Sequence, residues 1–185
     1  MSVAPQVVPD LLGADCSLHR LHVSSVELYG TFTARFGQAA VCSTALRSLQ
    51  LSTCGLRGPL PELRLPALER LSLEFNKFKG GLEPLRHCTA LLELQLNNNQ
   101  LKGGLEPLRG CTALQELKLS HNKLTGGLEP LRGCTELLDC HTRMADGSSR
   151  WHCHLHSLYL NDNRLICTDE DKDYFKRRCL SNFVI

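Results

Sequence analysis

The chain has 185 residues and a formal net charge of +2, with 21 Lys and Arg against 19 Asp and Glu. This length suits one domain, and the charge balance shows in bulk neither a nucleic-acid footprint nor an acidic tail. The start, Met1 to Cys16, lacks the basic and apolar regions of a secretory signal, and no run of about 18 apolar residues occurs. The composition therefore predicts an intracellular monomer without a membrane span, in which the 10 cysteines are thiols by default.

One pattern recurs along the chain, with leucines at its first, fourth and sixth positions, a polar residue at the ninth and an apolar one at the eleventh. The full copies open at Leu46, Leu68, Leu91, Leu114 and Leu155. The first four lie 22, 23 and 23 residues apart, a period typical of leucine-rich repeats. A degenerate copy opens at Leu18, where an atypical terminal repeat is expected.

Each position of the repeat has a structural task. Side chains alternate along a strand, so the leucines point into a shared core, where each contributes roughly 1.5 to 3 kcal/mol. The ninth position turns the chain, and an amide there bonds to backbone groups that the turn would otherwise bury unpaired. The structural asparagines are Asn76, Asn99, Asn122 and Asn163, and Cys54 takes this place once.

The second half of each repeat predicts a tight bend followed by a helical turn. The pairs Gly80-Gly81, Gly103-Gly104 and Gly126-Gly127 permit the bend, and a Glu-Pro-Leu-Arg segment then suits the start of a helix. The expected fold is an α/β leucine-rich repeat solenoid, a curved horseshoe with a parallel sheet on its concave face and short helices or 3-10 turns on its convex face. The predicted single domain, 1–185, divides into an N-terminal cap with the degenerate repeat (1–45), regular repeats (46–137), an inserted loop (138–154) and the last repeat with a C-terminal cap (155–185).

The period fails once, because Leu155 follows Leu114 by 41 residues. The surplus contains Cys140, His141, Trp151, His152, Cys153 and His154. Thiolates and imidazoles are the ligands that zinc prefers, so these residues, Trp151 apart, are candidate metal ligands. No CxxC or HxxxH pair is present, and adjacent ligands point apart in an extended chain. The favoured interpretation is a surface loop held by Trp151, with no metal and no cofactor.

Three further cysteines, Cys88, Cys111 and Cys134, share one repeat position. They predict a ladder of small buried apolar groups rather than a redox or metal site. Beyond the repeats, the acidic run at Asp169 and the basic run ending at Arg178 fit the two ends of a capping helix. The basic run is too short to predict nuclear import.

The concave sheet face is the candidate functional surface, because the side chains between the inward leucines must point outward. The predicted partner-binding residues are Arg70, Ser72, Glu74, Phe75, Glu93, Gln95, Asn97, Glu116, Lys118, Ser120, His121 and Tyr159. Such a surface of mixed sign suits a protein partner, with the aromatic residues as anchors, and the alternative is a merely solvated face.

No catalytic arrangement emerges from this face. His121 has no nucleophile at its level, and Glu93 with Glu116 is more simply a solvated pair than an acid/base dyad. The paired glycines recur in every regular repeat and are structural, so they do not indicate a phosphate-binding loop. We expect no enzymatic activity.

The run from Leu51 to Leu56 and the Gly-Gly-Leu-Glu-Pro-Leu segment from Gly80 to Leu85 resemble the repeats of the acidic leucine-rich nuclear phosphoprotein 32 family. The resemblance extends from about Leu18 to the C-terminus. It implies a non-enzymatic nuclear or cytoplasmic protein that binds histones or inhibits protein phosphatase 2A. The family's acidic tail has no counterpart up to Ile185, and the insertion is foreign to its pattern.

The sequence therefore predicts a protein–protein interaction module, with a phosphatase catalytic subunit or a histone as the first candidate partners. One alternative is a metal- or nucleic-acid-binding protein that acts through the His/Cys-rich insertion. Another is a structural subunit of a spliceosomal or phosphatase complex.

Overall fold

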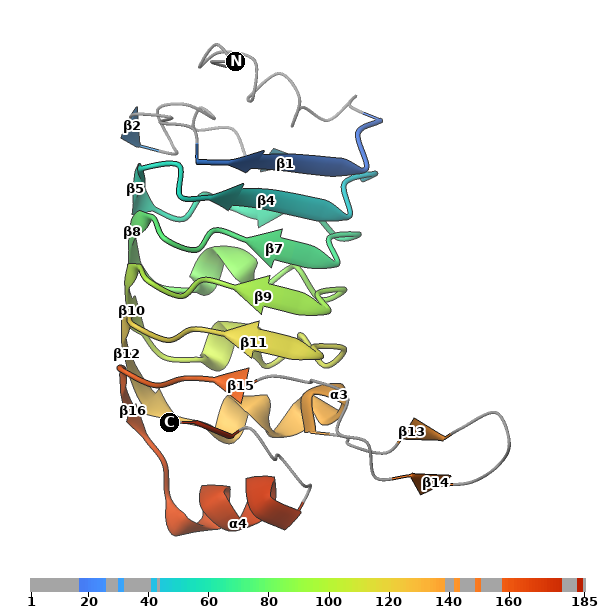
Figure 1. Cartoon of the computed structure of the whole chain (residues 1–185), viewed down its shortest axis with the longest axis vertical. Helices are drawn as coiled ribbons and strands as arrows, with labels where there is room; N and C mark the ends of the chain where they lie inside the picture. Colours follow the sequence, from blue (N-terminus) through green and yellow to red (C-terminus); the bar gives the residue numbers. More distant parts are fainter. Residues whose placement is uncertain are drawn as a thin grey trace.

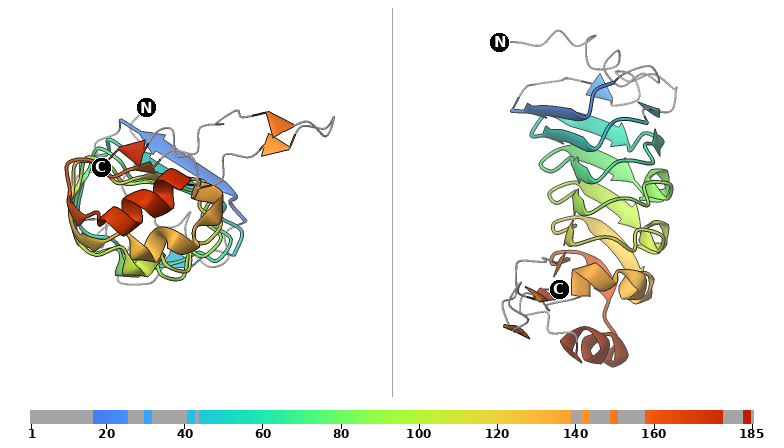
Figure 2. Two further views of the ribbon diagram at one scale, coloured as in Figure 1. Left: turned by 90° about the horizontal axis from the view of Figure 1, so that it is seen from below. Right: turned by 90° about the vertical axis from the view of Figure 1, so that its right-hand side faces the viewer.

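The computed structural model of the chain is a column of stacked coils (Figure 1). It describes residues 17–25, 30–31, 41–42, 44–138, 142–143, 149–150, 158–177 and 183–184. Seen along the column, successive coils superimpose around one interior (Figure 2). A coil therefore buries its apolar side chains against the coil before it and the coil after it.

The large sheet is parallel, in the order β1-β4-β7-β9-β11-β15-β17 (Figure 1). Its strands are β1 (Arg20–Ser24), β4 (Ser48–Ser52), β7 (Arg70–Ser72), β9 (Glu93–Gln95), β11 (Glu116–Lys118), β15 (Leu158–Tyr159) and β17 (Phe183–Val184). Each repeat supplies one strand, and β17 comes from the C-terminal segment beyond the last repeat. The register pairs equivalent positions, so that Leu71, Leu94 and Leu117 lie on neighbouring strands with their side chains buried. The predicted leucine-rich repeat solenoid is confirmed.

A second parallel sheet runs along the side of the column in the order β16-β12-β10-β8-β5-β2. Its strands are β2 (Gly30–Thr31), β5 (Leu56–Pro59), β8 (Lys77–Gly80), β10 (Gln100–Gly103), β12 (Lys123–Gly127) and β16 (Arg164–Ile166). The repeat pattern did not predict this sheet. Each strand is too short to be recognised alone, and pairing with the equivalent segments of adjacent coils is what makes it a strand.

The asparagine of each turn connects the two sheets and bonds to the preceding coil. The Asn99 Nδ2 group donates to the carbonyls of Leu73 and Leu96, both at 3.0 Å, and to its own strand end at Asn97. Its Oδ1 atom accepts from the backbone N–H of Phe78 at 3.0 Å. Asn76, Asn122 and Asn163 repeat this pattern. The predicted role of the asparagines is confirmed.

Cys54 takes the same place with a thiol. Its S–H group lies within bonding distance of two carbonyls, that of Val23 in the preceding coil at 3.4 Å and that of Ser52 at 3.3 Å. A thiol is a weak donor, so this turn reaches the preceding coil and its own strand end through weaker bonds than those of the asparagine amides.

The predicted glycine bends and helical turns complete each regular coil. Gly80, Gly103 and Gly126 have φ of 83°, 84° and 91°, values that favour glycine. The turns are the 3-10 helices η1 (Glu83–Leu85), η2 (Glu106–Leu108) and η3 (Glu129–Gly133), each with its proline in the first turn. Within the described residues, no helix is long and apolar enough to cross a bilayer.

The cysteine ladder lies beneath these helical turns. Cys88, Cys111 and Cys134 are fully buried, and each thiol lies close to a carbonyl of the preceding coil, as with the Cys111 Sγ atom at 3.5 Å from the Cys88 oxygen. Burial raises the pKa of Cys111 to about 11. A thiol with such a pKa stays protonated at neutral pH and is a poor nucleophile and metal ligand, in agreement with the predicted apolar role.

Three smaller elements complete the described structure. β3 (Val41–Cys42) pairs with β6 (Leu63–Arg64) in parallel, and the short helix α3 (Thr135–Leu138) follows η3. In the insertion, β13 (Thr142–Arg143) pairs with β14 (Ser149–Arg150) in antiparallel fashion and projects to one side of the column (Figure 1).

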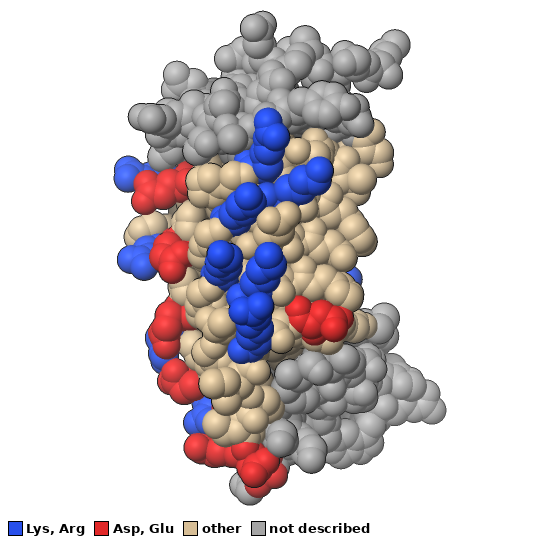
Figure 3. Space-filling view, turned by 90° about the vertical axis from the view of Figure 1, so that its left-hand side faces the viewer, with Lys and Arg blue, Asp and Glu red and all other residues tan. Residues whose placement is uncertain are grey.

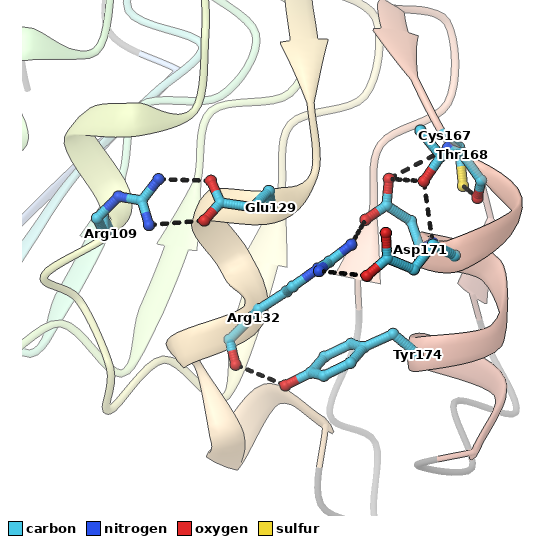
Figure 4. Close-up of polar contacts among 8 residues, drawn as sticks. Arg109, Glu129, Arg132, Cys167, Thr168, Asp171 and Tyr174 are labelled. Carbon is cyan, nitrogen blue, oxygen red and sulfur yellow. Dashed lines mark hydrogen bonds and ion pairs between the residues drawn. The ribbon is translucent and has the colours of Figure 1, made fainter.

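The helix α4 (Asp169–Arg177) lies across the end of the column and is fastened by a cluster of polar contacts (Figure 4). Arg132 of η3 pairs with Glu170 at 3.0 Å and with the buried Asp171 at 2.8 Å. The Tyr174 hydroxyl donates to the Arg132 carbonyl at 2.7 Å. The Asp171 N–H donates to the Thr168 hydroxyl, and the Thr168 N–H donates back to the Asp171 carboxylate, both at 3.1 Å. This reciprocal capping starts the helix, while Arg132 holds it against the last complete coil.

We expect Asn99→Ala to lower the free energy of unfolding by about 3 to 5 kcal/mol, because it removes four bonds to backbone groups that the turn encloses. Urea unfolding followed by circular dichroism measures this loss. The neighbouring Gln100→Ala variant is the control and should stay within about 0.5 kcal/mol of the parent. Equal effects of the two variants would contradict the role assigned to the Asn99 amide.

A second prediction concerns the pH dependence of the α4 cap. Burial raises the pKa of Asp171, but hydrogen bonds from Arg132 and Thr168 outweigh it, so the pKa lies below its ordinary value. A carboxyl whose pKa is lower in the folded chain than in the unfolded chain stabilises the fold at pH values above its unfolded pKa, about 3.9. This stabilisation is lost as the pH falls through the pKa of the folded chain. Asp171→Asn should therefore be less stable at pH 7 and should lack part of the acid loss below about pH 4.

Urea titrations between neutral and acidic pH, run in parallel, test this prediction. Glu136→Gln removes an exposed carboxylate of α3 and should keep the acid loss of the parent. If the free energies of unfolding of Asp171→Asn and of the parent ran parallel over the whole pH range, the Asp171 carboxyl would not be a source of the acid loss.

Candidate functional site

We define the polar face as the outward side chains of the large sheet and of the short segment that leads from each strand to the residue just before the turn asparagine. The structure places all twelve predicted partner-binding residues on this face, in rows of side chains that run from repeat to repeat. One row is Arg70, Glu93 and Glu116. The next runs Ser72, Gln95, Lys118, Tyr159. The sequence placed these side chains correctly because strand alternation is a local property.

Charges of opposite sign on the polar face pair both across strands and within one strand. The Arg70 Nε group lies 2.9 Å from the Glu93 carboxylate, and this bond raises the pKa of Arg70. The Glu116 Oε1 atom accepts from the Gln95 amide at 2.6 Å and pairs with the Lys118 ammonium at 2.7 Å. Glu93 and Glu116 are register neighbours, but each has its own cationic partner. The geometry is that of a mixed-charge surface rather than of two carboxyls sharing a proton.

Hollows interrupt this surface in several places. One, of about 450 Å³, lies towards its N-terminal end and is lined by Arg20, Leu21, His22, Ser48, Gln50 and Arg70, and two more lie further along. The first of these two, of about 250 Å³, lies over β4, β7 and β9 and is lined among others by His22, Gln50, Ser72 and Gln95. The second, of about 260 Å³, lies towards the C-terminal end and is lined by Asn97, Asn98, Lys118, Ser120, His121, Tyr159 and Asn161. In it, the Lys118 ammonium lies 5.9 Å from the centre of the Tyr159 ring. Both hollows are lined by hydrogen-bonding groups.

A rim of residues in the left-handed backbone region forms the edge of the polar face. The repeat register placed these positions at the edge, but sequence reasoning missed their left-handed conformation. These residues, with φ between 54° and 57°, are Ser25, Thr53, Phe75, Asn98, His121 and Asp162. Thr53, Phe75, Asn98 and His121 each donate their N–H group to a carbonyl of the following coil. The side-chain types differ from repeat to repeat, so residue type does not mark this conformation, and only the position just before the turn residue is shared.

The left-handed conformation at the rim exposes the side chain of Phe75 to solvent. Phe75 is 53% exposed, and Ile166 is the other exposed large hydrophobic residue of the described chain. Further along, the His121 Nδ1 atom lies 3.0 Å from the Asp162 carboxylate. Phe75 is therefore an apolar contact point beside a polar sheet face, a composition found at protein interfaces.

The candidate metal ligands of the insertion are not placed by the structure. Cys140, His141, His152, Cys153 and His154, with Trp151, lie outside the described residues, so their role stays a prediction. Among the residues that the structure does describe, no group of three His, Cys, Asp or Glu side chains is placed to hold a metal ion.

The comparisons with known proteins agree with this architecture. Residues 89–133 match the family model described as Leucine Rich repeats (2 copies). No curated protein matches the sequence. Many solved structures match the chain, and plant receptors and their complexes are among them.

The Arabidopsis thaliana receptor kinase HAESA, solved with the peptide hormone IDA and the co-receptor SERK1, has a TM-score of 0.64 and 24% identity over 85% of this chain. The plant peptide hormone receptor RGFR1, in complex with RGF2, has a TM-score of 0.58 and 25% identity over 80% of it. The ectodomain of the Arabidopsis thaliana receptor kinase SOBIR1 has a TM-score of 0.58 and 23% identity over 80%. The present chain spans 23%, 21% and 72% of those chains, respectively. Together with the coordinates, these likenesses show a leucine-rich repeat solenoid.

Proposed function

We propose that this chain is a protein-interaction module that binds an extended segment of a partner protein along its polar face. The observation that carries the proposal is the exposed Phe75 on the rim of a face that holds two polar-lined hollows. Aromatic and arginine side chains surrounded by polar groups are the usual energetic centres of protein interfaces. Phe75, Arg70 and Tyr159 are the anchors in this proposal.

The electrostatics of the polar face support binding of a partner with both signs of charge. The Arg70–Glu93 and Lys118–Glu116 pairs are each roughly a third exposed. Pairs of this kind contribute little to stability, about 0 to 1 kcal/mol. Their charges can therefore turn to an incoming chain at small cost to the fold. RGFR1, the plant peptide hormone receptor at 25% identity, was solved in complex with RGF2, which supports a protein or peptide as the class of partner.

For the identity of the partner, a histone or a phosphatase catalytic subunit remains the hypothesis suggested by the family resemblance. Glu74, Glu116 and Asp162 would supply acidic groups to a basic histone segment. The proposal also includes an intracellular location, since the buried Cys88, Cys111 and Cys134 are thiols, the usual state of cysteine in a reducing compartment.

The Arg70→Glu/Glu93→Arg double variant tests the proposed face. It keeps the net charge and the ion pair but exchanges the positions of the acidic and the basic residue. Stability should therefore change by less than about 1 kcal/mol, whereas partner affinity should fall about tenfold or more. The matched control is Glu62→Arg/Arg64→Glu, which reverses another exposed pair outside the polar face. Calorimetric titration with histone peptides and with a phosphatase catalytic subunit measures the affinities.

A photo-crosslinking amino acid at position 75, with the exposed position 87 as control, identifies the partner in native extract. Crosslinks confined to position 75 and lost in the pair-reversed variant are expected. Capture that is indifferent to the reversal, or equal from both positions, would place the binding surface elsewhere.

Phe75 allows stability and binding to be separated at one residue. Its φ of 54° costs about 1 to 2 kcal/mol for a residue with a β-carbon, so Phe75→Gly should keep or raise the melting temperature while weakening partner binding. Phe75→Val should lower the melting temperature, because a β-branched side chain resists this conformation. If Phe75→Gly bound the partner as tightly as the parent, Phe75 would not be an anchor.

A further inference from the structure

Six cations gather on the second sheet, away from the polar face. These residues, which we call the basic stripe, are Arg57, Lys77, Lys79, Lys102, Lys123 and Arg164. All are exposed. Figure 3 looks onto this side of the molecule and shows a line of Lys and Arg side chains along the column, with acidic side chains beside it but not within it. The alternation of the second-sheet strands turns these side chains out while Phe78, Leu101 and Leu124 turn in.

The basic stripe is uncompensated within the described residues. None of the ion pairs found there includes a stripe residue, whereas Arg70, Lys118, Arg109 and Arg132 on the other faces are all paired with carboxylates.

The register makes this arrangement unfavourable for the isolated fold. Arg57 pairs in register with Lys77, and Lys102 pairs with Lys123. Like charges directly opposite on neighbouring strands destabilise a sheet. A partner that brings negative charge would remove this repulsion.

The dimensions indicate a linear polyanion. Neighbouring strands lie about 4.8 Å apart, so the four strand steps from β5 to β16 spread the six charges over roughly 19 Å. A nucleic-acid duplex carries one negative charge per about 1.7 Å of its axis, a density that matches or exceeds that of the stripe over its whole length. Lysines act as flexible point charges towards phosphates and need no fixed bidentate geometry.

The other side chains of the stripe argue for contact with a phosphate backbone rather than with bases. The outward positions not occupied by Lys or Arg on β10, β12 and β16 are Gln100, Thr125 and Ile166. The described strands of the stripe therefore present no outward aromatic platform of the kind on which single-stranded bases stack. Contacts to phosphates position a nucleic acid without reading its sequence.

Two other polyanions fit the stripe less well. An acidic peptide would gain backbone bonds only at a free strand edge, and β5, β8, β10 and β12 are paired on both sides. An anionic bilayer is broad, and it would also meet the exposed carboxylates of Glu106 and Glu129 on the neighbouring helical turns, which repel it.

We propose that the basic stripe binds the phosphodiester backbone of a nucleic-acid duplex, independently of the protein-binding polar face. The formal net charge of +2 conceals this surface, because β5, β8, β10, β12 and β16 carry these cations and no acidic residue. DNA and RNA share the phosphate chemistry, and the test includes both.

Fluorescence anisotropy with labelled DNA and RNA duplexes of about 20 base pairs, longer than the stripe at about 3.4 Å per pair, measures binding by the whole chain. With up to six phosphates engaged, the logarithm of affinity should fall against the logarithm of salt concentration with a slope of about −5. The Lys79→Gln/Lys102→Gln/Lys123→Gln variant should reduce the slope by about 3 and weaken binding at least about tenfold.

The matched control is Arg47→Gln/Arg64→Gln/Arg86→Gln, which removes the same charge from exposed positions outside the stripe. It should lose much less affinity than the stripe variant, and circular dichroism should show that both variants are folded. No binding of either duplex at low salt, or equal losses in the two variants, would overturn the proposal. Tighter binding of polyglutamate or of phosphatidylserine vesicles than of both duplexes would overturn it as well.

Discussion

The hydrogen bonds of one asparagine amide per repeat hold the column together. When the chain leaves the large sheet it turns at once, and the turn encloses carbonyls that no strand partner can reach. The Asn99 amide meets this demand by donating to its own coil and to the preceding one. Its oxygen accepts from the Phe78 N–H group, in β8 of the preceding coil. Each coil therefore depends on its neighbour for its backbone bonds as well as for its leucine contacts.

This turn also determines the geometry of the surface. The residue just before each asparagine adopts a positive φ, which lifts its side chain onto the rim, and the residues after the asparagine extend to form the second sheet. One short segment therefore separates the polar face from the basic stripe. Because the repeats stack in register, equivalent positions of successive repeats form a row of side chains. The charge of such a row is the sum of the charges that the coils contribute to it.

The two charged surfaces differ in the signs of the charges along these rows of side chains. On the polar face, charges of opposite sign meet, across strands at Arg70 and Glu93 and within β11 at Lys118 and Glu116, and the result is a paired surface suited to a partner of mixed charge. On the second sheet, neighbouring strands carry like charges, as at Lys102 and Lys123, and the result is a field of one sign. The Arg132–Asp171 pair shows a third use of charge, in which a cation of the last full coil closes the end of the column.

The sequence by itself determined the solenoid, its buried leucines, the asparagine turns, the glycine bends and the identity of the outward residues on the large sheet. All of these follow from periodicity and alternation, which operate within a single repeat. Only the tertiary structure decided the second sheet, the left-handed rim at residues such as Phe75, the pairing of Arg70 with Glu93 and the fastening of α4 by Arg132. These features join residues of different coils, and the basic stripe in particular exists only when five short strands from five repeats lie side by side.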